Sequence, residues 1–205
     1  MSEKITSTFT LYGNKAALEL EQEIIRRFKA DYDKGNDKYT SVTRILYGLD
    51  QDAKFDGYEL LGAYQCMYFG STHQLQIQSA VCPPFKLHDH IVNHMAKIDP
   101  KIVVQMDYIG NTPSIVGTRF LGISDDMELL SAESEEELNY WFCDEDEMEE
   151  MLEDLREQGQ DDQNVMSHQR LDEITEEMRQ FAYDSFISSY GYDIKLQEPK
   201  SPTLF

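Results

Sequence analysis

The chain has 205 residues, enough for one domain of ordinary size with an appendage, and its formal net charge at pH 7 is −21. About 22 acidic residues lie between Asp125 and Glu177 with only Arg156 and Arg170 among them, so the rest of the chain is close to neutral. A charge concentrated in this way repels nucleic acid and anionic membranes, and it attracts a basic protein surface.

The first 123 residues predict alternating strands and helices. Apolar residues at every second position predict strands, and apolar residues at helical spacing predict helices. In chain order we expect a strand at 5–12, a helix capped by Asn14, strands at 58–69 and 75–81, a helix at 85–98, and strands at 101–108 and 114–121. The order β-α-β-β-α-β with one extra strand predicts an α+β fold with a ferredoxin-like body, in which both helices lie on one face of an antiparallel sheet.

The acidic region that follows predicts helices. Ser134 precedes three glutamates and is typical of a helix N-cap, so we expect a helix over residues 131–138. Further helices are predicted over residues 144–157 and 167–188, and the apolar stripe of each indicates packing on the body or on another helix. The predicted organisation is a body at 1–123, an acidic helical region at 124–190 and an extended tail at 191–205.

A short segment and the elements after it carry a resemblance to a known family. Ser79-Ala80-Val81-Cys82-Pro83-Pro84 is followed by a predicted helix, an Asp-Pro stop, a strand that ends in Tyr108 and a turn at Gly110. This arrangement, over roughly residues 5–121, resembles the YubB-like ferredoxin-fold proteins of plasmids and phages. In that family the strand runs into a Trp-x-Pro-Pro-like segment, and here Val81 or Cys82 stands in place of the aromatic residue. The resemblance implies a mobile-element origin and a compact α+β body, and it implies no activity.

Composition also indicates the compartment. No run approaches the roughly 18 apolar residues of a membrane span, and the first residues show no secretory signal pattern. Cys66, Cys82 and Cys143 are widely spaced and odd in number, which is typical of a reducing compartment without disulfides. We therefore expect a cytoplasmic protein without membrane contact.

The density of carboxylates favours a binding function. Residues 144–157 carry roughly one net charge per 2.6 Å of helix, against one per ~1.7 Å in double-stranded DNA. We therefore expect a non-enzymatic interaction protein that binds a basic, nucleic-acid-binding host protein as an inhibitor or DNA-mimic-like decoy. An anti-defence role agrees with this expectation, and no nucleic acid is expected to bind directly. The candidate partner-binding residues are Glu135, Glu136, Glu137, Trp141, Phe142, Asp144, Glu145, Asp146, Glu147, Glu149, Glu150, Glu153, Asp154 and Glu157, with the two aromatic side chains as apolar anchors.

Two alternatives stay open at this stage. His88, His90 and His94 could form a metal site of a metal-binding protein or hydrolase, but Ile91 stands where a His-Glu-x-x-His zinc enzyme has its glutamate. The simpler interpretation places these histidines on a polar helix face. Alternatively, the acidity serves solubility only. No cofactor motif is present, and the sequence leaves open whether the chain self-associates.

Overall fold

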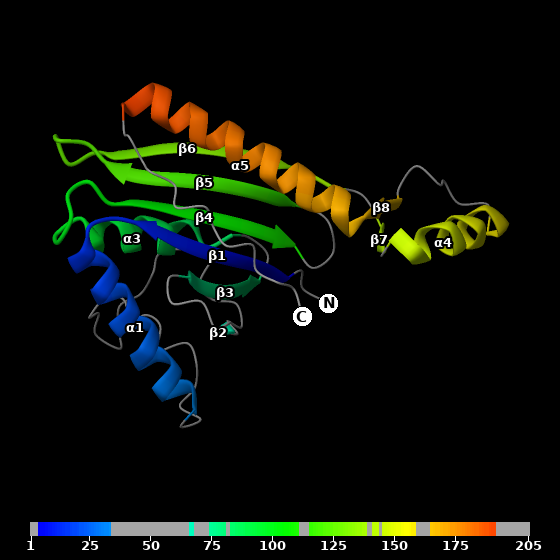
Figure 1. Ribbon diagram of the computed structural model, residues 1–205, viewed down its shortest axis with the longest axis horizontal. Helices are drawn as coiled ribbons and strands as arrows, with labels where there is room; N and C mark the ends of the chain where they lie inside the picture. Colours follow the sequence, from blue (N-terminus) through cyan, green and yellow to red (C-terminus); the bar gives the residue numbers. More distant parts are fainter. Residues whose placement is uncertain are drawn as a thin grey trace.

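A six-stranded antiparallel sheet forms the centre of the molecule (Figure 1). The structure, a computed structural model, describes residues 4–33, 66–67, 74–80, 83–110, 115–138, 141–143, 145–158 and 165–191. Its elements in chain order are β1 (Lys4–Tyr12), α1 (Lys15–Asp33), β2 (Cys66–Met67), β3 (Gln74–Ala80), α3 (Phe85–Met95), β4 (Val103–Gly110), β5 (Val116–Ile123), β6 (Leu129–Glu136), β7 (Trp141–Cys143), α4 (Glu145–Glu157), β8 (Val165–Ser167) and α5 (His168–Tyr190). The predicted α+β class is confirmed.

The strand order brings distant parts of the sequence together. Hydrogen-bonded neighbours follow the order β2-β3-β1-β4-β5-β6, and every pair in this sheet is antiparallel. Phe9 of β1 lies opposite Leu75 of β3 on one side and Met106 of β4 on the other. β7 and β8 form a separate two-stranded parallel sheet, in which Phe142 lies opposite Met166.

Each face of the sheet has its own apolar core. On the first face, Phe9 and Met106 pack with residues of α1 and α3, among them Leu87. On the second face α5 lies along β5 and β6, as Figure 1 shows, and Phe120 and Phe186 are fully buried there. Alternate residues of a strand point to opposite faces, which is why one strand such as β4 can serve both cores. A third cluster continues the second core and contains Val116, Leu138, Met166, Leu171, Ile174 and Met178.

Side chains at the helix ends explain where two helices begin. The backbone N–H of Ala17 donates to Asn14 Oδ1 at 3.0 Å, so the predicted N-cap of α1 is confirmed. The hydroxyl of Ser167 accepts from the Arg170 N–H at 3.1 Å and caps α5 in the same way. α5 ends at Gly191, whose φ of 66° is the left-handed conformation that glycine adopts most readily.

The helix predicted over residues 131–138 is wrong, because residues 129–136 form β6. Leu130 and Ala132 pack against the second core beneath α5, while the residues between them point to the other face. Pairing with β5 over the whole strand therefore outweighs the local N-cap signal of Ser134. β6 extends the main sheet and α5 covers it, so residues after Ile123 complete the body.

The remaining predicted elements agree with the structure where it describes them. The predicted strand at 58–69 lies outside the described residues except for β2, and the predicted tail at 191–205 lies outside them except for Gly191. The predicted helix at 85–98 ends at Met95 and continues as a turn. Among the helices that the structure describes, none is long and apolar enough to cross a membrane.

A buried carboxyl group lies on the inner side of α1. Glu21 is only 3% exposed, and neither of its carboxyl oxygens has a hydrogen-bond partner among the described residues. Burial disfavours the charged form and raises the pKa of Glu21 to about 9. The side chain is therefore a protonated, neutral group of the core at neutral pH.

Replacing Glu21 tests this protonation state through stability. The native pKa lies above the usual value of 4.5, so the folded chain keeps a proton that the unfolded chain releases. The free energy of unfolding should be greatest below about pH 4.5 and decrease as the pH rises towards 9, by about 2–3 kcal/mol between pH 5 and pH 7. Glu21→Gln should remove this decrease, so that the variant is the more stable protein at pH 7 and similar to wild type at pH 5. Urea denaturation at the two pH values measures the difference.

The matched control is Glu19→Gln, which changes an exposed glutamate of the same helix. This variant should keep the wild-type dependence of stability on pH. An equal pH dependence in wild type and Glu21→Gln would contradict a protonated Glu21.

Candidate partner-binding surface

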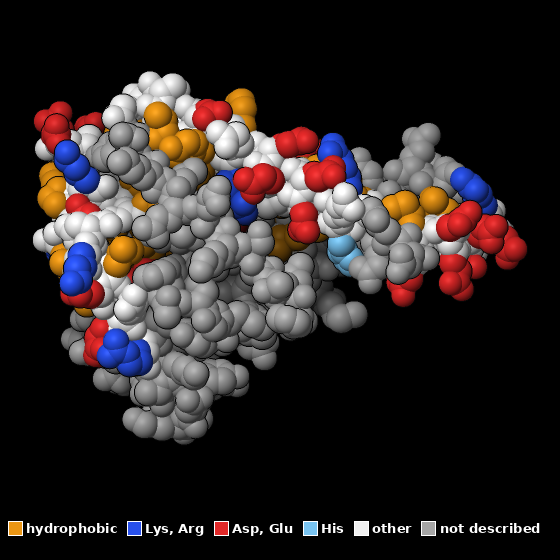
Figure 2. Space-filling model, in the orientation of Figure 1, with side chains coloured by type: hydrophobic (Ala, Val, Ile, Leu, Met, Phe, Trp, Pro, Cys, Tyr) orange, Lys and Arg blue, Asp and Glu red, His pale blue; other side chains and the backbone are white. Residues whose placement is uncertain are grey.

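α4 carries the densest group of exposed carboxylates in the described chain. It has a net charge of roughly −7 along about 20 Å of helix. Its apolar residues, such as Met151 and Leu155, are half-buried, and its main contacts are with β7 and β8. Figures 1 and 2 show α4 beyond the end of the main sheet, with acidic side chains gathered on it. The exposed carboxylates are those of Glu147, Glu149, Glu150, Glu153, Asp154 and Glu157.

The other predicted binding residues are distributed differently. Glu135 and Glu136 lie on β6 and Glu137 directly follows it, all three being exposed. The structure does not place these three on a helix, so the predicted pair of acidic helices is reduced to α4. Asp144 lies outside the described residues, as do the side chains of Trp141, Phe142, Glu145 and Asp146, whose backbones belong to β7 and α4.

Two glutamates of β6 already have a partner within the chain. The hydroxyl of Tyr108 lies 2.9 Å from Glu133 Oε1 and 2.6 Å from Glu135 Oε2. The Tyr108 ring reaches β6 by crossing Gly117 on β5, where a Cβ atom would collide with it. Burial, together with the hydrogen bond to Glu135, raises the pKa of Tyr108 above its usual range, so the hydroxyl remains a donor. Glu135 is therefore an intramolecular acceptor as well as an exposed acid.

Arg119 holds the same side of the sheet together. Its guanidinium group lies 3.1 Å from Asp89 Oδ1 on α3 and 4.0 Å from Glu133 Oε2 on β6. The guanidinium carbon is also 5.2 Å from the centre of the Phe85 ring, within the range of a cation–π contact. One half-buried cation thus pairs with carboxylates of α3 and β6, neither of which is among the predicted partner-binding residues.

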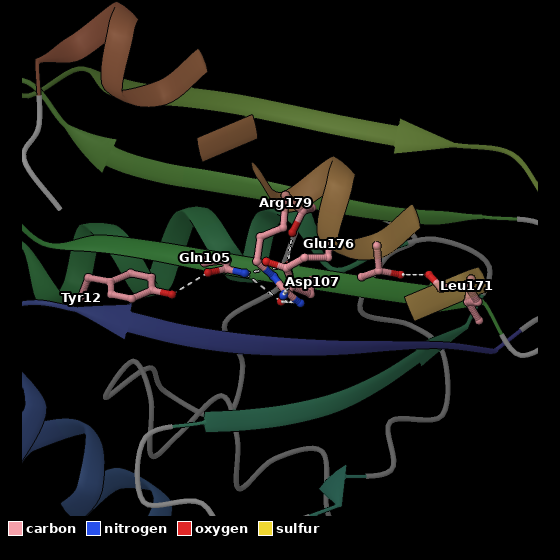
Figure 3. A network of polar contacts seen from close by, with 8 residues as sticks. Tyr12, Gln105, Asp107, Leu171, Glu176 and Arg179 are labelled. Carbon is pink, nitrogen blue, oxygen red and sulfur yellow. Dashed lines mark hydrogen bonds and ion pairs between the residues drawn. The ribbon is translucent and has the colours of Figure 1, made fainter. Parts of the chain in front are cut away.

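A second polar network lies on the opposite face, between α5 and the sheet (Figure 3). Asp107 on β4 accepts hydrogen bonds from Gln105 Nε2 at 2.8 Å, from Arg179 Nη2 at 3.2 Å and from the Thr118 hydroxyl. The Tyr12 hydroxyl donates to Gln105 Oε1 at 2.6 Å, which links β1 to the same network. The carboxylate of Asp107 therefore accepts from donors on two strands and one helix, and β1 joins the network through Gln105.

The charges in this network are mutually dependent. Burial lowers the pKa of Arg179, but the carboxylates of Asp107 and Glu176 outweigh it and hold that pKa above its usual value. Burial and the charge of Asp107 raise the pKa of Tyr12, so its hydroxyl also stays protonated. Arg179 contacts Glu176 on the preceding turn of α5 in addition to Asp107. These side chains orient one another, which gives them a structural role, although the buried Nε of Arg179 has no hydrogen-bond partner among the described residues.

Neither network has a recognisable signal in the sequence. Tyr12 lies 95 residues before Asp107 and Arg179 lies 72 residues after it, and no motif relates the three. The available hint was a polar residue at every second position of a strand otherwise rich in apolar residues, as at Gln105 and Asp107 of β4. That pattern predicts the face of the sheet but not the partner across it.

The three histidines do not come together. His88 is fully buried, with Nε2 2.9 Å from the Val104 carbonyl oxygen and its ring edge-on to Phe9, and burial lowers its pKa to about 3. The prediction that it lies on a polar helix face is therefore wrong. His90 is exposed and His94 half-buried. Within the described ranges, no group of three or more His, Cys, Asp or Glu side chains is arranged to hold a metal ion.

Comparisons of the chain with protein-family models, curated proteins and solved structures found no match. No residue role is therefore transferred from a relative. The candidate surface rests on the geometry and charge of α4 and β6.

The Asp107–Arg179 pair can be tested by a double-mutant cycle. Asp107→Asn and Arg179→Met should each lower the free energy of unfolding by about 2–4 kcal/mol, because each leaves the other group largely buried without its counter-charge. The double variant should lose less than the sum, with a coupling energy of about 1–3 kcal/mol. Urea denaturation at neutral pH measures all four proteins.

The control cycle uses Arg170→Met and Glu173→Gln, an ion pair on the surface of the same helix. Solvent screens this pair, so it should show no measurable coupling. Additive losses at Asp107 and Arg179 would contradict an ion pair that holds α5 on the sheet.

Proposed function

We propose that this chain is a non-enzymatic interaction protein in which α4 binds a basic, nucleic-acid-binding surface of a host protein. One observation carries the proposal, namely six exposed carboxylates on a single helix that lies beyond the end of the sheet. When a basic surface pairs with these carboxylates, the counterions of both surfaces are released into solution, much as when the basic surface binds phosphates. The proposed action is that of an inhibitor, a DNA-mimic-like decoy that occupies the site where the partner holds duplex DNA.

The way α4 is held supports binding rather than solubility alone. The helix contacts both β7, which precedes it, and β8, and these two strands pair with each other in a parallel sheet. A helix fixed in this way holds its carboxylates at set distances and loses less entropy on docking than a flexible acidic tail. The exposed carboxylates of α4 can therefore pair with a row of basic side chains without first being ordered.

We also propose a ferredoxin-like assignment for the first four strands. Two β-α-β units interleave when each crossover spans one intervening strand, and the order β2-β3-β1-β4 agrees with such an arrangement. α1 and α3 both pack on the first face, which is the further requirement of that topology. The origin in a plasmid or phage and the action within the cytoplasm remain part of this proposal, and they rest on the resemblance and the composition described above.

Neutralising α4 tests the function. A variant with the six exposed acids of α4 changed to Gln or Asn should lose a basic partner that wild type captures from nuclease-treated host lysate. Added salt should weaken the wild-type complex because the attraction is between exposed charges. Added duplex DNA should release the partner, since the proposed site on that partner is its nucleic-acid site. Quantitative mass spectrometry of the captured proteins measures each effect.

The matched control neutralises six exposed acids elsewhere, namely Glu19, Asp125, Asp126, Glu128, Asp172 and Asp184. It removes the same formal charge, so it should keep the partner if α4 is the site and lose it if net charge alone matters. Capture that is unchanged by the α4 variant, or by duplex DNA, would contradict the proposal.

A further inference from the structure

β6 forms one edge of the main sheet. Within the described part of the chain it pairs with β5 alone, over eight residues from Val116 opposite Glu136 to Ile123 opposite Leu129. Natural edge strands of this length usually carry charged side chains, most often lysine, or a proline or a β-bulge that hinders pairing with another chain. β6 has no lysine or proline, its register with β5 is continuous, and its charged residues are all glutamates, which disfavour an acidic strand but favour a basic one. Its outer row of backbone groups is therefore a template for a further strand.

On β6, acidic side chains point to the first face of the sheet. Glu133 and Glu135 lie opposite Arg119 and Gly117 of β5, so their side chains point to the first face. Both residues are exposed, although Tyr108 and Arg119 contact them from within. A strand added beside β6 would place every second side chain next to these carboxylates, where a lysine or arginine is favourable.

On the second face of the sheet, α5 provides an exposed apolar side chain near β6. Arg179 points from α5 towards Asp107 on β4. Phe181 follows two residues later, about 200° further around the helix, so it lies on the opposite flank, beside β6. Its side chain is 66% exposed, which is unusual for phenylalanine in a folded chain. The alternate side chains of an added strand would pass beneath this ring.

The same features disfavour a second copy of the chain as the added strand. Two β6 strands side by side would bring together six glutamates, Glu133, Glu135 and Glu136 from each copy, without a basic residue from either strand. The Tyr190 hydroxyl also donates to the Ser131 carbonyl oxygen at 3.2 Å, so a side chain already contacts the strand near its beginning. A new strand is therefore expected along residues 132–136, the acidic end.

We propose that the edge of β6 binds an extended segment of a partner protein as a seventh strand, and that this segment alternates basic with apolar residues. The basic side chains contact Glu133 and Glu135, and the apolar ones contact Phe181. This site is separate from α4. It is a second contact for the proposed partner or for another protein.

A synthetic peptide provides the direct test. The probe is a fluorescein-labelled hexapeptide of alternating Lys and Val, and its control is the same peptide with N-methyl groups on every second backbone amide. Both peptides have the same charge, but the methylated one lacks a row of donors for strand pairing. Fluorescence anisotropy should show binding of the first peptide that is at least about tenfold tighter than that of the second. Hydrogen exchange should slow at amides of residues 132–136 when the first peptide is bound.

Two variants locate the contact. Phe181→Ser removes an exposed ring and should weaken peptide binding without affecting the fold, and Glu133→Gln combined with Glu135→Gln should weaken it through lost charge. The α4 variant with six neutralised acids should bind the peptide as wild type does, which separates this proposal from the proposed function. Equal affinity for the methylated peptide, or unchanged affinity in both edge variants, would overturn strand addition. A dimer in sedimentation analysis that the peptide dissociates would instead assign the edge to a second copy and overturn the proposed partner.

Discussion

The ion pair between Asp107 and Arg179 fixes the position of α5, and the acidic end of the molecule depends on that position. Apolar contacts such as Phe120 with Phe186 hold a helix on a sheet, but they are non-directional and tolerate sliding. A carboxylate that accepts hydrogen bonds from a guanidinium group has a defined geometry. Because α5 follows β8 directly, fixing the helix also fixes the strand that pairs with β7, and β7 and β8 hold α4.

The acidic residues of this chain divide into two classes that net charge does not distinguish. Asp89, Asp107 and Glu133 lie near Arg119 or Arg179 and stabilise the packing of helices on the sheet. Those of α4 are exposed, and the main contacts of their helix are with β7 and β8 alone. The second class is fully available to a partner, whereas a carboxylate that is already paired within the chain, such as that of Glu133, offers less to an incoming cation. Net charge counts both classes alike, so it overstates the number of carboxylates that are available to a partner.

The fold was predictable from the sequence wherever the local pattern and the tertiary environment agree. β4 is rich in apolar residues, and Asn14 caps α1 through its own side chain, so neighbouring residues suffice to define both features. At β6 the local sequence pattern and the tertiary environment disagree. Ser134 with its glutamates favours a helix start, whereas the vacant edge of β5 offers eight residues of backbone pairing, and the pairing prevails. His88 was placed on the wrong face for a related reason, because its neighbours in the sequence do not reveal the carbonyl of Val104.

The sequence by itself determined the α+β class, the acidity of the second half and the helical nature of α4 and α5, because periodicity and charge are properties of consecutive residues. The tertiary structure alone decided which acids are neutralised, since Asp107 meets Arg179 across 72 residues and Tyr108 meets Glu135 across 27. It also decided that β6 is an edge, because strand order depends on the free energy of the whole sheet. Local residues encode the elements, and long-range contacts select the surface that remains for a partner.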